Sequence, residues 1–378
     1  MNQEWEKEIS DFLEKRNLSN TYRTLTLPLT GIDVCSNDYL GLSRSEWIRR
    51  RVQQKLSQHY RYASHGATGS RLLSGNSELV EQLEAQIAQF HSTESALLFG
   101  SGYMANIGVI STLARAGHII FYDQNIHASL LQGIALSSAK SFAFAHNNLG
   151  DLSNLAQQQR GKIRYVVIES IYSMDGDSID KEALLALCKA HQLILIVDEA
   201  HAVGIYGKKG QGMFTTEEAP VRIVTYGKAL GIHGAAVLSN TLIRNYLINF
   251  CKTFIYTTAQ PLHELLTLSI TYEYLYLFDN QKNKLLKIIN YFKNKYSIND
   301  DKIAGVGPIF AYLIGDTSKA KQLALQLQEK GIYCKPIVYP TVARGQERLR
   351  INLHSYNTQE ELDTIMQIIY TWKTKATL

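Results

Sequence analysis

The chain has 378 residues, of which 45% are hydrophobic and 19% are charged. This balance is typical of a water-soluble globular protein of two or three packed domains, and it excludes a disordered tail, a fibrous repeat and a membrane protein. The net charge of +5 is too small and too evenly spread to indicate nucleic-acid binding by itself.

Cysteine usage and the N-terminal residues predict a cytoplasmic protein. The four cysteines lie far apart and form no C-x-x-C pair, so the sequence offers neither a disulfide framework nor a zinc signature. The N-terminal stretch MNQEWEKEISDFLEKR is charged throughout and contains no apolar signal core. No stretch approaches the roughly 18 apolar residues that a bilayer-spanning helix needs. We therefore expect no metal centre, no export and no membrane anchor.

The predicted elements begin with a short amphipathic helix, in which Trp5, Ile9 and Phe12 recur at helical spacing. An irregular loop around Pro28 and the segment SNDYLGLS follow, and from about Ser77 helices alternate with short apolar runs. Continuous, β-branched runs separated by helices predict strands covered on both faces, hence an α/β fold with a mostly parallel sheet. The runs are SALLFG (95–100), IIFYD (119–123), RYVVIE (164–169), LILIVDEA (193–200), RIVTYG (222–227) and GAAVL (234–238).

The composition changes after about residue 275, where a stretch rich in Lys and Asn keeps an apolar helical stripe from Leu285 to Phe292. We interpret its lysines as a solvated helix face rather than a binding patch. A second α+β unit follows and ends in a helix, for which Thr358 and Glu361 form a capping box. The predicted organisation is an N-terminal helix and segment (1–45), a large domain (46–275) and a small C-terminal domain (276–378).

Lys228 is the candidate nucleophile. It stands in TYGKALGIHGAA, after an apolar strand and among glycines that leave space around the backbone. Desolvation or cationic neighbours can lower the pKa of a lysine, so that its free amine attacks an aldehyde. By itself a Gly-Lys pair is weak evidence, and an ordinary surface lysine after a turn is the alternative.

Asp198 ends an apolar run thirty residues before Lys228. A carboxylate beside a buried strand is costly unless it meets a cation, and a protonated pyridine nitrogen is such a partner. His201 follows three residues later and could flank the same ring. The alternative is a helix-capping aspartate with a surface histidine.

The string DEAH also marks a group of nucleic-acid helicases, which need a phosphate loop of the form G-x-x-x-x-G-K-[ST]. The Gly-Lys pairs at 161–162, 207–208 and 227–228 are followed by Ile, Lys and Ala, and none of these has the hydroxyl that would hold magnesium. The helicase hypothesis therefore fails, and we expect no nucleic-acid partner.

Three further segments carry candidate binding residues. GSGYMAN joins a strand to a helix, and its small residues with free helix N–H groups predict a phosphate cradle at Gly102 and Tyr103. His127 follows the strand IIFYD and could lie against the face of an aromatic ring. Arg350, in RLRINLHS, could bind a carboxylate with its fork of donors, although one of the two arginines in this strand could be structural.

Taken together, these segments resemble the pyridoxal-phosphate-dependent α-oxoamine synthases, which have the aspartate-aminotransferase-like fold. The resemblance runs nearly end to end, and it implies an acyltransferase with pyridoxal 5'-phosphate as its cofactor. Several strings in one order make the resemblance specific. They are SNDYLGLS (36–43), TGSRLLSGN (68–76), SGYMAN (101–106), HAS (127–129), ESIYSMDGD (169–177), VDEAHAVG (197–204), TYGKALGIHGAAVL (225–238), IYTTAQP (255–261) and PTVARGQERLRI (340–351).

The resemblance assigns the cofactor contacts residue by residue. Lys228 would hold pyridoxal 5'-phosphate as a Schiff base and later remove the α-proton of the substrate, while Asp198 would pair with the ring nitrogen. The other contacts would come from His201 and Ser173 around the ring, His127 stacked on it, and Gly102, Tyr103 and Thr225 at the phosphate.

The resemblance also implies the substrates and the assembly. Arg350 would take the amino-acid carboxylate with Asn37 nearby, His127 would also face the substrate, and Arg23 and Thr341 match positions that contact substrate. GAAVL after the lysine loop is similar to the alanine-using members of biotin biosynthesis. The implied substrates are therefore L-alanine and a pimeloyl thioester, carried on coenzyme A or on a carrier protein. The implied assembly is a homodimer with sites at the interface.

The sequence departs from the family pattern in two places. The segment before SNDYLGLS is shorter than in many members, and HSYNT replaces a run of small residues after RLRINL. One alternative is a related synthase with another amino acid and acyl thioester, of the 5-aminolevulinate, 2-amino-3-ketobutyrate or quorum-signal type. A non-catalytic relative that serves as a partner subunit is the other alternative, and the retained lysine argues against it.

Overall fold

The computed structural model describes residues 2–27, 30–59 and 66–377. The chain forms two compact units. The large unit comprises Asn37–Ser173 and Ser178–Asn283, and the small unit comprises Met1–Ser36, Met174–Asp177 and Lys284–Leu378.

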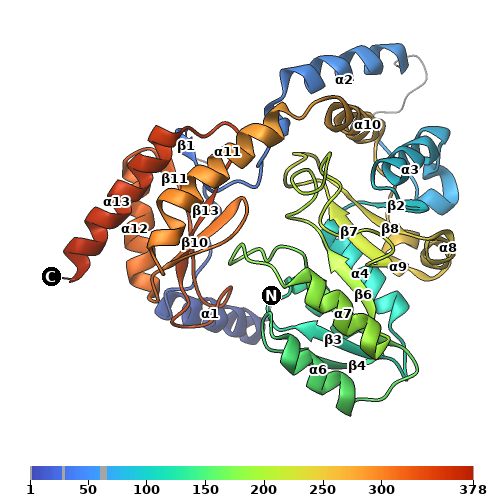
Figure 1. Ribbon diagram of the computed structural model, residues 1–378, viewed down its shortest axis with the longest axis horizontal. Coiled ribbons are helices and arrows are strands. Elements are labelled where there is room, and N and C mark those ends of the chain that lie inside the picture. The colour runs from blue at the N-terminus through green and yellow to red at the C-terminus, as the bar shows by residue number, and fades with distance from the viewer. Residues whose placement is uncertain (1, 28–29, 60–65, 378) are drawn as a thin grey trace. The chain divides into compact units, whose positions relative to one another are not determined.

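The large unit is built on a seven-stranded sheet, which Figure 1 shows with helices around it. All neighbouring strands pair in parallel except β8, which runs antiparallel to both of its neighbours. The prediction of a mostly parallel sheet is thus confirmed. The strand order is β2 (Ser95–Phe99), β8 (Ala235–Ser239), β7 (Val221–Thr225), β6 (Ile194–Asp198), β5 (Arg164–Glu169), β3 (Ile119–Asp123) and β4 (Lys140–Phe144).

The apolar runs of the sequence become strands because both faces of the sheet are covered. On β5, Val167 belongs to one hydrophobic core while its neighbours Val166 and Ile168 belong to another, as the alternation of side chains along a strand requires. Helices α4 (Gly102–Leu113) and α5 (Ala128–Leu136) contribute to the first core. Helices α6 (Leu149–Gln158) and α7 (Lys181–His191) contribute to the second.

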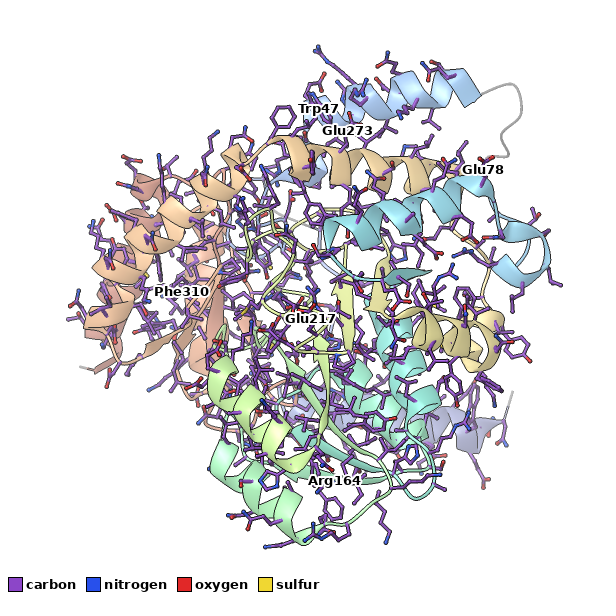
Figure 2. The ribbon with its side chains drawn as sticks, turned by 45° about the vertical axis from the view of Figure 1, so that its right-hand side comes forward. Trp47, Glu78, Arg164, Glu217, Glu273 and Phe310 are labelled. Carbon is purple, nitrogen blue, oxygen red and sulfur yellow. The ribbon has the colours of Figure 1, made fainter. Side chains whose placement is uncertain are left out.

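Further helices complete the large unit. The helix expected from Ser77 is α3 (Glu78–Phe90), with Ser77 as its N-cap. Helix α2 (Glu46–His59) packs on α10 (Leu262–Leu277), and Figure 2 shows Trp47 and Glu273 on these two helices. The Trp47 ring meets the Tyr274 ring edge-on, with 5.6 Å between centroids. Two further α-helices of this unit are α8 (Thr241–Phe250) and α9 (Lys252–Ile255).

The small unit contains a four-stranded antiparallel sheet in the order β12 (Pro336–Ile337), β13 (Arg348–Asn352), β10 (Ile309–Leu313) and β9 (Ile303–Ala304). Its core includes Phe310, labelled in Figure 2, whose ring lies 4.7 Å from that of Phe292. Its helices include α12 (Thr317–Glu329) and α13 (Gln359–Thr377), and Phe292 comes from α11 (Asn280–Lys295).

The capping box predicted for the last helix is confirmed. The backbone N–H of Thr358 donates to the Glu361 carboxylate at 3.0 Å, and the backbone N–H of Glu361 donates to the Thr358 hydroxyl at 3.2 Å. The apolar stripe of α13 is fully buried at Leu362, Ile365 and Ile369. The capping box therefore marks where this helix begins, and the apolar stripe marks the face that it buries.

The N-terminal segment differs from the sequence analysis, which set residues 1–45 apart. Met1–Ser36 belongs to the small unit, because β1 (Ile32–Asp33) pairs in parallel with β11 (Ile332–Tyr333). The predicted first helix is α1 (Gln3–Leu18), but none of its residues is buried and its apolar stripe is exposed.

Pro28 lies outside the described residues. Across those that are described, no helix combines the length and the apolar character that crossing a bilayer requires.

Candidate active site

The candidate catalytic and binding residues of the large unit lie at one edge of the seven-stranded sheet, at the carboxyl ends of its parallel strands. The segments that follow β2, β3, β5, β6 and β7 at this edge line a pocket of about 180 Å³. Ligand sites of α/β proteins form at this edge because loops from several strands converge there. Seven of the predicted cofactor residues line the pocket: Gly102, Tyr103, His127, Asp198, His201, Thr225 and Lys228.

Lys228 reaches the pocket from the loop after β7. It is half-buried, and its Nζ lies 3.4 Å from Nε2 of His201. Gly231 closes this loop with a φ of +67°, and a Cβ there would lie 2.5 Å from the backbone nitrogen of Ser43. The glycine spacing noted in the sequence therefore lets the lysine loop pack tightly.

Asp198 lies at the end of β6 and is almost fully buried. One carboxylate oxygen accepts the backbone N–H of Ala200 at 2.9 Å, and the other accepts the side-chain amide of Asn106 at 2.6 Å. These two hydrogen bonds fix the position of the buried carboxylate, which is suited to pair with a cation in the pocket. This is what a protonated ring nitrogen requires.

His127 forms the N-cap of α5. Its Nδ1 accepts the backbone N–H of Ser129 at 3.3 Å and lies 2.7 Å from the Ser129 hydroxyl. Burial lowers the pKa of His127; the charge of Asp198 opposes this shift and that of Lys228 adds to it. His127 is therefore neutral at physiological pH, with its Nε2 carrying the proton.

The first turn of α4 fits a phosphate group. Ser101 caps this helix through the backbone N–H of Met104, which leaves the N–H groups of Gly102 and Tyr103 available. A Cβ on Gly102 would lie 2.3 Å from Cγ2 of Thr225, so only glycine leaves this space open. The buried Thr225 hydroxyl has no hydrogen-bond partner among the described residues, as expected where a ligand supplies one.

Glu169 is a pocket residue that the sequence analysis overlooked as a candidate. Burial raises its pKa well above the usual range, and the charge of Asp198 on the neighbouring strand raises it further. Its carboxyl group accepts backbone N–H groups of His127 and Ser173, which lower the pKa. Oxygen Oε1 has no partner within the described part of the chain. Burial therefore favours the neutral form of Glu169, and its place at the carboxyl end of a parallel strand was the available signal.

Ser173 and Asn37 belong to the large unit but are not among the described residues that line the pocket. Ser173 is buried beyond β5. Asn37 accepts a hydrogen bond from the Tyr39 hydroxyl, and that hydroxyl also lies 2.8 Å from His201. Asn37 is therefore linked to the pocket through one side chain.

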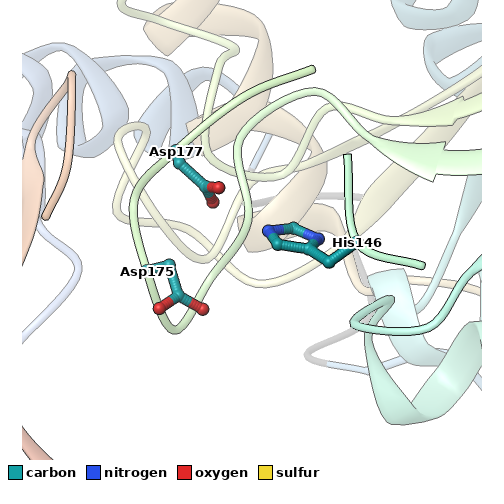
Figure 3. A group of neighbouring side chains, drawn as sticks. All are labelled: His146, Asp175 and Asp177. Carbon is teal, nitrogen blue, oxygen red and sulfur yellow. The ribbon is translucent and has the colours of Figure 1, made fainter. Parts of the chain in front are cut away.

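The other predicted substrate residues belong to the small unit. Arg23 donates to the Thr341 hydroxyl at 3.4 Å. Of the two arginines on β13, Arg348 is buried and forms an ion pair with Asp175, whereas Arg350 is half-buried. Figure 3 shows Asp175 and Asp177 on the short loop that belongs to this unit. Arg348 is therefore the structural arginine of the pair.

Comparison with protein families gives a match over residues 30–369 to the family described as aminotransferase class I and II. The chain belongs to this family. The match covers both compact units, so the pocket of the large unit lies within the family's own fold.

Two similar curated proteins carry the same name. A protein from Lysinibacillus sphaericus named 8-amino-7-oxononanoate synthase is 33% identical, covering 88% of this chain and 86% of the relative. One of the same name from Emericella nidulans is 36% identical, covering 96% of this chain and 95% of the relative.

Solved structures agree on the fold. The 8-amino-7-oxononanoate synthase of Francisella tularensis has a TM-score of 0.78 at 29% identity, covering 92% of this chain and 99% of that one. A serine palmitoyltransferase of Sphingomonas wittichii has a TM-score of 0.87 at 25% identity, covering 99% and 98%. The predicted aspartate-aminotransferase-like fold is thus confirmed.

Proposed function

We propose that this enzyme is a pyridoxal-phosphate-dependent acyltransferase that condenses L-alanine with a pimeloyl thioester, with loss of CO₂, to give 8-amino-7-oxononanoate for biotin biosynthesis. The observation that carries the proposal is one pocket that contains both the Lys228 amine and the buried Asp198 carboxylate. The curated relatives, which are matched over most of their length, supply the substrate class.

The pocket residues fit the cofactor. Lys228 would hold it covalently, Asp198 would pair with its ring nitrogen, and the helix α4 N-terminus with Thr225 would take its phosphate. His127, His201 and Ser173 would contact the ring, whereas Gly102 and Tyr103, in the first turn of α4, would contact the phosphate. When bound, pyridoxal 5'-phosphate supplies an aldehyde for the substrate amine and a protonated ring that withdraws electrons from the α-carbon.

The side chains of the pocket then divide the work of proton transfer. Nζ of Lys228, freed once alanine takes its place, removes the α-proton as a general base and later returns it. Asp198 accepts hydrogen bonds from Asn106 and from the backbone of Ala200, and this fixed carboxylate would hold the proton on the ring nitrogen. Neutral His127 presents an N–H donor from Nε2 without adding charge to the pocket.

We assign the substrate carboxylate to Arg350 with Asn37, and further substrate contacts to His127, Arg23 and Thr341. A guanidinium binds a carboxylate with two parallel hydrogen bonds, and Arg350 is the half-buried arginine of β13, whereas Arg348 is buried in an ion pair with Asp175. We further propose a cytoplasmic homodimer. The four cysteines are free, which supports a reducing compartment.

The test is the visible absorption spectrum of the purified protein loaded with pyridoxal 5'-phosphate, recorded before and after addition of L-alanine or glycine. We expect alanine to perturb the cofactor band and glycine to leave it unchanged. With pimeloyl-CoA, mass spectrometry should detect 8-amino-7-oxononanoate. The Lys228→Ala variant should lose the band of the covalently held cofactor and should form no product. Product formation by this variant at the parent rate would refute the assignment of Lys228.

The alternative is a related synthase that uses a different amino acid or acyl thioester. The structural similarity to a serine palmitoyltransferase supports this alternative. A panel of alanine, glycine, serine and 2-aminobutyrate against several acyl-CoAs separates the two. A carrier-protein thioester of pimelate belongs in the same panel. Turnover that is highest with serine or glycine would replace alanine in the proposal and leave the enzyme class intact.

A further inference from the structure

A buried tyrosine behind the pocket forms hydrogen bonds with two polar side chains of the large unit. Tyr39 has no solvent-exposed surface, and its hydroxyl donates to Oδ1 of Asn37 at 3.0 Å. The same hydroxyl oxygen lies 2.8 Å from Nδ1 of His201. On the other side of its ring, His201 places Nε2 3.4 Å from Nζ of Lys228. Four side chains thus form one continuous chain.

The proton inventory of this chain determines the direction of each bond. A phenol has one proton, and an amide oxygen such as Oδ1 of Asn37 only accepts, so the Tyr39 proton points to Asn37. The Tyr39 oxygen must then accept from His201, which requires the imidazole proton on Nδ1. In neutral His201 the other nitrogen, Nε2, therefore keeps its lone pair and faces the lysine amine.

We propose that Tyr39 is a positioning residue that fixes the His201 tautomer, with the proton on Nδ1 and an acceptor at Nε2 toward Lys228. In the opposite tautomer an N–H of His201 would face the N–H groups of Lys228, and Nδ1 would face an oxygen whose proton is already committed to Asn37. Both hydrogen bonds of His201 would be lost together. The Tyr39 hydroxyl therefore determines whether His201 can accept a hydrogen bond from Lys228, although Tyr39 does not contact Lys228 through this bond. The effect of Tyr39 on catalysis rests on the proposed function, whereas the tautomer of His201 does not depend on that function.

Nuclear magnetic resonance of the full-length protein with ¹⁵N-labelled histidine tests the tautomer directly. The measurement is made on the protein loaded with pyridoxal 5'-phosphate and on the cofactor-free protein, and a His201→Gln variant identifies the signals of His201 by their loss. We expect the parent to carry the proton on Nδ1 in both forms. In Tyr39→Phe, which removes only the hydroxyl, the signal of protonated Nδ1 should be lost or averaged between the two nitrogens.

Tyr226→Phe is the matched control. Tyr226 is also fully buried and lies two residues before Lys228, but its hydroxyl accepts from Tyr272 at 3.4 Å. Removal of this hydroxyl should leave the His201 signals unchanged. A parent protein with the His201 proton confined to Nε2 would overturn the proposal, and so would a Tyr39→Phe spectrum identical to that of the parent.

Steady-state kinetics give a second readout. Tyr39 is not among the described residues that line the pocket, so Tyr39→Phe should lower kcat about tenfold and change the KM for alanine less than about twofold. A rise in KM with unchanged kcat would contradict a role through Lys228. If the parent turns over no alanine but shows the Nδ1 tautomer and its loss in Tyr39→Phe, the proposed substrate fails while the positioning role of Tyr39 stands.

Discussion

Asn106 joins the two sides of the pocket, because its side-chain amide donates both to Asp198 at 2.6 Å and to the Ser129 hydroxyl at 2.9 Å. Since Ser129 accepts this bond, its own proton is available to Nδ1 of His127, 2.7 Å away. The Asp198 carboxylate and the His127 ring are therefore both oriented through one buried side chain. Asn106 follows Gly102 by one helical turn, so the helix whose N-terminus we propose for the phosphate also supports Asp198.

Replacement of Asn106 by Ala should weaken cofactor binding. The change removes a hydrogen bond to a buried charge, a contact worth about 1.5–3 kcal/mol, which corresponds to a loss of roughly tenfold or more in affinity. Titration of the cofactor-free protein with pyridoxal 5'-phosphate, followed by absorbance, measures this loss. Asn249→Ala removes an exposed asparagine amide bonded to a backbone oxygen on α8 and should bind as the parent does. Equal affinity of both variants would argue against the role of Asn106.

Glu169→Gln should make stability less dependent on pH. Burial raises the pKa of Glu169 well above its ordinary 4.5, so the folded protein keeps a proton that the unfolded chain releases as pH rises. The contribution of this group to the free energy of unfolding is therefore greatest below pH 4.5 and falls as pH rises toward the folded pKa. Glutamine resembles the neutral acid at every pH, so the variant does not lose this contribution to the free energy of unfolding as pH rises.

The expected result for Glu169→Gln is a midpoint of urea unfolding close to that of the parent at pH 5 and above it at pH 8. Each unit of pKa shift corresponds to about 1.4 kcal/mol, so the difference is measurable. Glu217→Gln, at an exposed glutamate labelled in Figure 2, should match the parent at both pH values. A Glu169→Gln variant that is less stable than the parent at pH 8 would mean that the native group is ionised.

The sequence predicted those parts of the fold that depend on local pattern. The run 119–123 and the run 164–169 are β3 and β5 to the residue, because buried parallel strands require continuous apolar side chains. Strand β4 (Lys140–Phe144) was not predicted, since it lies at the sheet edge and most of its side chains are exposed or half-buried. The exposure of α1 was equally hidden, because amphipathic spacing does not say what covers the apolar face.

The site was predictable only where a residue carries a role by its type. A lysine after a glycine turn and an aspartate at the end of a strand are recognisable in the sequence, and the pocket brings them together. Asn106 and Tyr39 were not recognisable, since their functions arise from bonds to Asp198 and His201 that only the folded chain creates. A side chain that orients another side chain can be recognised only from the distances between them, and a sequence contains no distances.

Gly102→Ala should impair phosphate binding, and a second substitution should restore it. A Cβ at Gly102 would lie 2.3 Å from Cγ2 of Thr225 and 3.2 Å from its Cβ, so Thr225 must move away from the helix N-terminus. Thr225→Ser removes Cγ2 and keeps the hydroxyl. We expect Gly102→Ala to lower the affinity for pyridoxal 5'-phosphate about tenfold, and the double variant Gly102→Ala/Thr225→Ser to recover most of it. Equilibrium dialysis measures both, and additive losses in the double variant would exclude this steric explanation.

The two arginines of β13 should separate stability from substrate binding. Arg348 is buried and pairs with Asp175, which is a quarter exposed, and Arg348 also donates to the backbone oxygen of Gln346 at 2.8 Å. Loss of one partner of a fully buried pair costs roughly 3–5 kcal/mol, so for this partly exposed pair we expect Arg348→Met to cost about 2 kcal/mol of unfolding free energy. Its affinity for alanine should stay within about threefold of the parent at temperatures where it is folded.

Arg350→Met should do the reverse. Its loss of unfolding free energy should be smaller than that of Arg348→Met, because Arg350 is only half-buried. Its affinity for alanine should fall by about tenfold or more, because a charge-assisted pair with the substrate carboxylate is lost. Urea unfolding and an alanine titration of the cofactor band, each carried out on both variants, give four values. If Arg348→Met loses alanine affinity while Arg350→Met loses stability, the roles of the two arginines are exchanged, and the carboxylate site must be assigned to Arg348.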